Sequence, residues 1–215
     1  MYKKKPLFVT FEGIEGSGKS YQSHKLFKNL KRKGLHPILT REPGGTASAE
    51  KIRNLILKDY FHRDSKEKFD KYTDTLLYLA SRNEHVKNKI LPAIQKKSIV
   101  ICDRFIDSTI AYQIYGKRVN KNLIDIIHKY ILGSLKPDIT FVLIAKISKA
   151  MKRLNKRKKK NRYDKFSSKF YDNVQKAFIK IAKSNRKRYF IVDNTVDTPD
   201  TEKTILKLFL KKLKK

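Results

Sequence analysis

The sequence predicts an α/β protein with a five-stranded parallel sheet that has helices on both faces. Short apolar runs, rich in β-branched and aromatic residues, alternate with longer segments of helical periodicity along the 215 residues. The apolar runs show little polar/apolar alternation, as expected for strands that are buried on both faces. Because strands and helices alternate, we expect a parallel sheet in one domain over residues 1–215.

The apolar runs place the five strands at Leu7–Phe11, Pro37–Thr40, Ser98–Cys102, Ile139–Ile144 and Tyr189–Val192. Helical patterns predict helices over Tyr21–Lys33, Ala47–Leu57, Tyr72–Ala93, Ser108–Tyr115, Lys121–Leu132, Ser148–Arg157, Lys169–Arg186 and Thr201–Leu213. Gly34 is a natural end for the first helix. Ligands of such sheets bind outside the carboxyl ends of the strands, so polar residues at those ends are candidate site residues.

The chain is strongly basic, with 52 Lys and Arg against 20 Asp and Glu and a formal net charge of +32. One explanation is an anionic partner such as nucleic acid or polyphosphate. The explanation we favour is coding bias in an A+T-rich genome, because Lys predominates over Arg, Trp is absent and Gly is sparse. The basic residues are spread along the whole chain, so we expect no specific nucleic-acid partner.

Cysteine content and hydropathy indicate a cytoplasmic protein that does not bind membranes. The single cysteine, Cys102, lies in an apolar run, so no disulfide can form within the chain, which is consistent with a reducing compartment. No apolar run approaches the length of a membrane span. Residues Met1–Pro6 carry three lysines, but the apolar run that follows is too short for a signal peptide.

Residues 13–20 fit the phosphate-binding P-loop pattern G-x-x-x-x-G-K-[ST] and read Gly13-Ile14-Glu15-Gly16-Ser17-Gly18-Lys19-Ser20. An expected strand precedes them and an expected helix follows. The glycines let backbone N–H groups curl around an anion, and the helix dipole adds positive charge there. Lys19 is expected to reach the β- and γ-phosphates and the Ser20 hydroxyl to ligate Mg²⁺. This predicts a P-loop NTPase fold that binds ATP with Mg²⁺.

Further polar clusters follow the second and third strands. The run Arg41-Glu42-Pro43-Gly44-Gly45-Thr46 follows one, and Asp103-Arg104-Phe105 follows the other. Arginine suits phosphate because its planar fork binds two oxygens at once. Tyr78 lies one helical turn before Arg82, so both side chains are on the same face of the helix and the tyrosine ring could stack on a base. The pattern indicates an enzyme that moves phosphate from ATP to a nucleotide.

These motifs in this order resemble the thymidylate kinase family, from Phe8 to about Asp197. The resemblance rests on E-G-x-E-G-x-G-K in the P-loop, followed by T-R-E-P-G-G-T, D-R-F and A-Y-Q. It implies that ATP and dTMP react to give ADP and dTDP, which supplies dTTP biosynthesis and DNA synthesis. It also implies a homodimer.

The resemblance assigns the dTMP site to Glu15, Arg41, Tyr78, Arg82, Arg104, Ser108, Thr109, Tyr112 and Gln113. It implies that two arginines, Arg41 and Arg104, hold the dTMP phosphate. An alternative for them is a surface ion pair. Asp103 corresponds to a carboxylate that acts on Mg²⁺ through water.

For the nucleoside, the resemblance implies that Tyr78 stacks on thymine and that Arg82 bonds its carbonyl edge. Thr109 and Gln113 contact the base. Glu15 accepts from the sugar 3′-hydroxyl, and Tyr112 crowds the 2′ position. Alternatives remain at two of these positions: core packing for Tyr78 and a helix surface for Thr109. Adenine recognition is expected near Asp193–Thr198.

A mobile basic lid is expected at about residues 152–165. Eight of the eleven positions from Lys152 to Arg162 are Lys or Arg, whereas the variable positions of the P-loop carry no basic residue. Transition-state arginines would then come from the lid, with Arg153, Arg157 and Arg162 as candidates beside Lys19, Arg104 and Asp103. Relatives usually have Asp before the lid arginine, whereas this chain has Asn161. No general base is required for an acceptor phosphate that is already anionic.

Other functions remain as alternatives. A kinase for another nucleotide or a deoxynucleoside shares the P-loop, although Arg41 and Arg104 favour a phosphorylated acceptor and Tyr112 a deoxy sugar. A nucleic-acid-stimulated P-loop ATPase gives the acceptor motifs no role. A purely structural protein leaves the Lys19-Ser20 pair unexplained.

Overall fold

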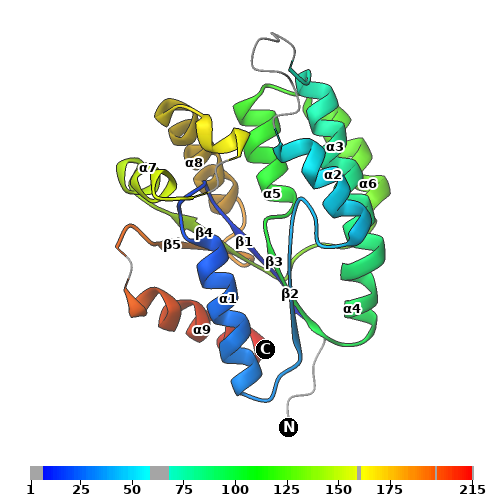
Figure 1. Cartoon of the computed structure of the whole chain (residues 1–215). Helices are drawn as coiled ribbons and strands as arrows, with labels where there is room; N and C mark the ends of the chain where they lie inside the picture. Colours follow the sequence, from blue (N-terminus) through cyan, green and yellow to red (C-terminus); the bar gives the residue numbers. More distant parts are fainter. Residues whose placement is uncertain (1–6, 59–67, 159–160, 197, 215) are drawn as a thin grey trace.

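The computed structural model describes residues 7–58, 68–158, 161–196 and 198–214. Five parallel strands form one sheet in the order β2-β3-β1-β4-β5 (Figure 1). They are β1 (Phe8–Glu12), β2 (Pro37–Arg41), β3 (Ile99–Asp103), β4 (Ile139–Ile144) and β5 (Tyr189–Asp193). The predicted fold class is confirmed, and each strand begins and ends within one residue of its expected bounds.

Helices α1 (Lys19–Arg32) and α9 (Pro199–Leu213) cover one face of the sheet. Because side chains alternate along a strand, Val9 and Phe11 of β1 both point to this face and pack against Leu30 and Phe209. Helix α1 ends at Arg32, and Gly34 follows it with a φ of +71°. The N–H of the next residue returns to the carbonyl of Leu30, which closes the helix end.

The other face is covered by helices that carry most of the candidate acceptor residues. Phe8 of β1 points to this side and packs with Val86 and Phe105, while Tyr112 packs with Phe178 farther along. The elements on this side are α2 (Ala47–Leu57), α3 (Lys71–His85), α4 (Leu91–Gln95), α5 (Ile106–Thr109), α6 (Lys121–Leu132), α7 (Ile147–Asn155) and α8 (Ser168–Lys183).

Two predicted helices contain π-helical segments that the sequence pattern does not indicate. The helix expected over Tyr72–Ala93 is α3, then the π-helical segment η1 (Val86–Ile90), then α4. Pro92 lies at the start of α4 and has no N–H to continue the α-helical ladder. The helix expected over Ser108–Tyr115 is α5 followed by the π-helical segment η2 (Ile110–Gly116). Such segments are rare and are frequent at functional sites.

The end of α8 also differs from the expectation. The helix ends at Lys183, although the pattern predicts it to Arg186. The side-chain oxygen of Asn185 accepts from the N–H groups of Lys187 and Arg188, and this local turn competes with further helix. Among the described residues, no helix has the length and apolarity needed to cross a membrane.

Candidate active site

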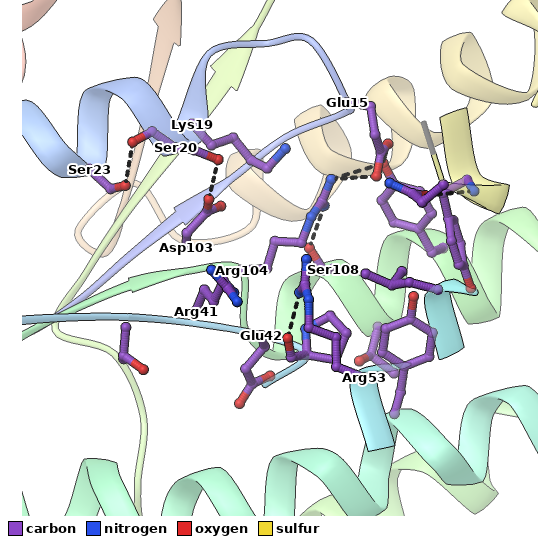
Figure 2. A pocket seen from close by; sticks show the side chains of 18 of the residues that line it. Glu15, Lys19, Ser20, Ser23, Arg41, Glu42, Arg53, Asp103, Arg104 and Ser108 are labelled. Atoms are coloured by element: carbon purple, nitrogen blue, oxygen red, sulfur yellow. Dashed lines mark hydrogen bonds and ion pairs between the residues drawn. The ribbon is translucent and has the colours of Figure 1, made fainter. Parts of the chain in front are cut away.

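The carboxyl ends of β1, β2 and β3 surround a cavity of about 430 Å³ (Figure 2). The predicted site residues that line it are Glu15, Lys19, Ser20, Arg41, Tyr78, Arg82, Asp103, Arg104, Ser108, Thr109, Tyr112, Gln113 and Arg157. The three polar clusters that the sequence places at separate strand ends therefore meet in one site.

The loop between β1 and α1 has the backbone conformation that its glycines allow. Gly13, Gly16 and Gly18 have φ values of +138°, +73° and +92°, which L side chains rarely adopt. At Gly16 a Cβ atom would also lie 2.9 Å from the carbonyl carbon of Ala150. The loop has no room for a side chain there, so the close approach to α7 requires glycine.

Lys19 is a buried cation at the start of α1. Its side chain is turned back along the loop, and Nζ donates to the carbonyl oxygen of Ile14 at 3.0 Å. Burial and, after it, the nearby positive charge of Arg104 lower the pKa of the amine to about 8, although Asp103 and Glu15 act against this. An anion bound in the loop would stabilise the charged amine.

Ser20 and Asp103 join the loop to the end of β3. The Ser20 hydroxyl donates to Oδ2 of Asp103 (Figure 2), and Oδ1 of Asp103 is buried with no hydrogen-bond partner in the part of the chain that the structure describes. The Ser20 hydroxyl and the unpaired carboxylate oxygen of Asp103 together fit Mg²⁺. This ion typically binds one or two protein oxygen ligands together with phosphate oxygens. Within the described ranges, no cluster of three or more His, Cys, Asp or Glu residues could hold a metal.

Arg104 connects the loop with the acceptor side of the cavity. Its Nη2 lies 2.7 Å from Oε1 of Glu15, and Nη1 donates to the carbonyl of Gly13 at 3.0 Å and to the Ser108 hydroxyl at 2.9 Å. The Tyr112 hydroxyl donates to the other Glu15 oxygen. Burial alone raises the pKa of Glu15, but Arg104 and Lys19 outweigh it and bring this pKa below its ordinary value.

A second carboxylate, Glu12 at the end of β1, is fully buried and interacts electrostatically with Arg104. It accepts from the backbone N–H of Phe105 at 2.8 Å and from the Ser108 hydroxyl at 2.6 Å. These bonds fix the turn in which Arg104 has a φ of +70°, a conformation that costs energy for a residue other than glycine. Burial raises the pKa of Glu12 to about 7, with a further contribution from Asp107.

Arg82 is buried in the acceptor wall and held by three neighbours. Its Nε donates to Glu42 at 2.7 Å, and Nη1 lies 2.8 Å from the Thr109 hydroxyl and 2.7 Å from Nε2 of His128. Nη2 also lies 2.7 Å from Glu42. Burial, together with the positive charge of Arg82, lowers the pKa of His128 to about 3, so the imidazole is neutral and accepts the hydrogen bond. These contacts leave one N–H of Nη2 without a partner among the described residues, and Arg82 lines the cavity.

Two arginines approach the cavity from β2 and α2. Arg41 is half-exposed and pairs with Glu50, with Nη2 3.0 Å from Oε1. Arg53 donates to the carbonyl of Pro43 at 2.6 Å and lines the same cavity. Burial lowers the pKa of Arg53, and the adjacent charge of Arg41 adds to this. The two guanidinium groups therefore concentrate positive charge where an anion would relieve their repulsion.

Three tyrosine rings line the cavity. Tyr78 on α3 faces Tyr163 edge-on, with ring centroids 6.0 Å apart, and Tyr163 contacts Tyr112 in the same way at 6.1 Å. Tyr163 belongs to the short 3₁₀ segment η3 (Arg162–Lys165), inside the segment predicted as a lid. Tyr78 is partly buried and lines the cavity, so its ring is accessible to a ligand.

The three candidate lid arginines lie in different places. Arg157 lines the cavity and donates to Oδ1 of Asp164 at 3.1 Å. Arg153 donates to the carbonyls of Gly16, Asn194 and Thr195 at 2.9–3.1 Å, which supports the P-loop from behind. Arg162 pairs with Asp74 outside the cavity. Residues 159–160 of the predicted lid, and residue 197 of the predicted adenine segment, lie outside the described residues.

The family model described as Thymidylate kinase matches residues 11–205. The chain belongs to the thymidylate kinase family. It is 38% identical over 211 residues to a thymidylate kinase of Mycoplasma capricolum, covering 97% of this chain and 96% of that one. It is 46% identical over 179 residues to one of Wolbachia pipientis wMel, covering 82% and 85%.

Solved structures agree with this family. The crystal structure of thymidylate kinase from Ehrlichia chaffeensis has a TM-score of 0.74 with 33% identity, over 96% of this chain and 99% of that one. The thymidylate kinase family is the one that the sequence motifs indicate, so that prediction is confirmed.

Sequence reasoning assigned no individual role to several residues in or beside this cavity: Glu12, Glu42, Arg53, His128 and Tyr163. Glu12 and Glu42 lie inside the quoted motifs, and that position was an available signal. Arg53 lies in the helix that begins directly after the Arg41–Thr46 run. His128 lies on α6, far along the chain from any motif, so the pattern gives no sign of its contact with Arg82.

Proposed function

We propose that this chain transfers the γ-phosphate of ATP to dTMP, giving ADP and dTDP. The observation that carries the proposal is one cavity lined both by the P-loop residues Lys19 and Ser20 and by an arginine-rich acceptor wall. Phosphoryl transfer to dTMP is the known activity of the thymidylate kinase family, and the family membership supports the proposal.

The donor half of the site consists of the P-loop. The N–H groups of the loop and the start of α1 would bind the ATP phosphates, and Lys19 would move from the Ile14 carbonyl to the β- and γ-phosphate oxygens. Ser20 and Asp103 would hold Mg²⁺. When bound, this ion neutralises phosphate charge.

In the acceptor half, Arg104 would bind the dTMP phosphate from β3, while Arg41 and Arg53 would bind it from the opposite side. Glu15 and Tyr112 meet beside Arg104, where the sugar would lie. The Glu15 carboxylate would accept from the 3′-hydroxyl. The Tyr112 ring would crowd a 2′-hydroxyl and so disfavour ribose.

The thymine ring would lie between Tyr78 and Arg82. Tyr78 supplies a ring for stacking. The remaining N–H of Arg82 would donate to a thymine carbonyl, and Thr109 and Gln113, both buried at the cavity wall, would complete the contacts with the base. This arrangement supports a pyrimidine with a carbonyl at the contacted edge.

The chemical step requires positioning and charge neutralisation rather than a general base, since the attacking phosphate oxygen is already anionic. Arg157 is the candidate lid residue that lines the cavity. We assign to it the neutralisation of the negative charge that develops on the transferring phosphoryl oxygens. Arg153 would act instead by supporting the Gly16 carbonyl of the P-loop.

A coupled ADP-release assay with ATP and Mg²⁺ tests the proposal by comparing dTMP with dUMP, dCMP, dGMP, AMP and thymidine. A strong preference for dTMP is expected. Preference for another acceptor would overturn the thymine assignment but keep the P-loop kinase. Hydrolysis that rises with DNA or RNA and needs no acceptor would favour the nucleic-acid ATPase.

We also propose that the protein is a cytoplasmic homodimer. Helices α2 and α3 pack side by side, as do α3 and α6. They carry exposed apolar side chains, with Tyr130 86%, Ile126 57% and Leu76 49% exposed. Burial of such residues in a dimer would be favourable. Sedimentation equilibrium of the wild type and of Tyr130→Glu tests this, and a monomeric wild type would contradict it.

A further inference from the structure

Asp74 is a buried carboxylate on α3 whose partners come from two other segments. Its side chain is 1% exposed. Oδ2 accepts from Nζ of Lys117 at 2.6 Å and from the Tyr163 hydroxyl at 2.9 Å, and Oδ1 pairs with Arg162. Lys117 follows η2, and the other two residues begin η3. One carboxylate thus joins α3, the end of η2 and the segment predicted as a lid.

The η3 segment in turn holds Arg157. Asp164 lies two residues beyond Arg162, and its carboxylate accepts hydrogen bonds from two groups. Its Oδ2 accepts from the N–H of Asn161 at 2.9 Å, and Oδ1 lies 3.1 Å from Nη1 of Arg157. The Asp164 side chain is fully buried, whereas that of Arg157 is 44% exposed. The position of this long exposed side chain therefore depends on where η3 places Asp164.

Asp74 also belongs to the face of α3 that lines the acceptor site. It lies one helical turn before Tyr78 and two turns before Arg82. The ring of Tyr163, held by its hydroxyl to Asp74, packs edge-on against Tyr78. The same helix therefore carries the base platform and the anchor of η3, so the acceptor wall and Arg157 share one rigid support.

We infer that Asp74 is a positioning residue for phosphoryl transfer, which anchors η3 so that Asp164 holds Arg157 at the transferring phosphate. This inference rests on the role of Arg157 in the proposed function. Removal of the Asp74 charge would release Arg162 and leave the Tyr163 hydroxyl its contact with Lys117 but not its charged acceptor, so η3 would lose its fixed place on α3. Arg157 would then sample many orientations, and the chemical step would slow while dTMP and ATP still bind.

A double-mutant cycle with Asp74→Asn and Arg157→Ala tests this inference. In the wild-type background, Asp74→Asn should lower kcat about tenfold, with the KM for dTMP within about twofold of normal. In the Arg157→Ala background the same change should lower kcat by less than about twofold, since the residue through which Asp74 acts is gone. Equal fold losses in both backgrounds would overturn the inference.

The cycle separates the inference from the proposed function. An Arg157→Ala variant with normal kcat overturns the role of Arg157, and the inference with it. A large loss in Arg157→Ala with an additive effect of Asp74→Asn overturns the inference alone.

A second variant covers the case in which Asp74→Asn does not fold. Tyr163→Phe removes the hydroxyl that donates to Asp74 and accepts from Lys117, and it keeps the ring against Tyr78. It should give a smaller loss of kcat that likewise disappears in the Arg157→Ala background, and an additive loss would contradict the inference. Asp172→Asn, which removes an exposed ion pair with Lys176 on α8, is the matched control and should leave kcat unchanged.

Discussion

Glu15 of the P-loop and Arg104 at the end of β3 form an ion pair, with Oε1 and Nη2 2.7 Å apart. Both side chains are largely buried, so the carboxylate and the guanidinium each depend on the other for compensation of charge. The burial of Arg104 lowers its pKa, but Glu15 outweighs this and raises the net pKa well above its ordinary value. The pair connects the loop that would hold ATP to the residue that would hold the acceptor phosphate.

Lys19→Ala should lower kcat by roughly a thousandfold, because the ammonium neutralises charge on the transferring phosphate. The effect on folding should be small, because among the described residues the amine makes one hydrogen bond, to the Ile14 carbonyl. Steady-state kinetics and thermal unfolding of the same preparation check both points. Near-normal turnover would contradict the P-loop assignment. Lys25→Ala, on the exposed side of α1, is the control.

Arg82→Ala should raise the KM for dTMP by about tenfold or more and leave the KM for ATP near normal, because in the proposed function Arg82 is a charged donor to the base. Initial rates at varied dTMP and at varied ATP separate the two constants. An equal rise in both would count against a role in base recognition.

The Arg82 variant leaves Glu42 buried without its partner, which is destabilising. Thr109→Val is therefore the milder companion, since it removes one hydrogen bond to Arg82 and keeps the shape of the side chain. It should give a smaller rise in the KM for dTMP with no change for ATP.

Arg157 and Arg153 of the predicted lid should give two different phenotypes, and Arg162→Ala should lower kcat less than Arg157→Ala does. Arg157→Ala should lower kcat by at least about 100-fold with little change in thermal stability, because a half-exposed arginine at the cavity acts on the transition state. Arg153→Ala should lower the melting temperature as well, since it loses three bonds to backbone carbonyls around the P-loop. A larger kcat loss for Arg162→Ala than for Arg157→Ala would reverse the assignment.

The strands and the strand-end motifs were predictable because each depends on a short stretch of sequence. A buried parallel strand is an apolar run, and Arg41 and Arg104 follow such runs directly. The roles of the lid arginines, in contrast, could not be predicted from a short stretch of sequence. Whether Arg153 or Arg157 faces the cavity depends on the end of α7 and on Asp164, and the composition of a basic run carries no such information.

Partners from distant segments were not predictable for the same reason. The contact between Arg82 and His128 joins α3 to α6, and its basis is helix packing. The π-helical segment that carries Tyr112 and Gln113 has the apolar pattern of an ordinary helix. Sequence periodicity indicates which face of a helix is buried, but not which residue of another helix meets it.

Glu12 should make the stability of this protein fall with rising pH near neutrality. The folded-state pKa of Glu12, about 7, lies above the ordinary value of 4.5 because the carboxyl is buried beside Asp107. Between these two values the folded protein retains a proton that the unfolded chain has lost. The free energy of unfolding therefore decreases as pH rises through this window, by at most about 1.4 kcal/mol per pH unit, and levels off above pH 7.

Glu12→Gln removes this titration, so the difference in unfolding free energy between wild type and variant isolates it. Urea unfolding at pH 5 and at pH 7.5 should show that the wild type loses more stability than Glu12→Gln over this interval. Glu202→Gln is the control, because the hydrogen bond from Asn29 and the charge of Lys25 keep the pKa of Glu202 below 4.5, outside the window. Parallel changes in wild type and Glu12→Gln would mean that Glu12 is ionised throughout, and the turn that carries Arg104 would then rest on a permanent buried charge.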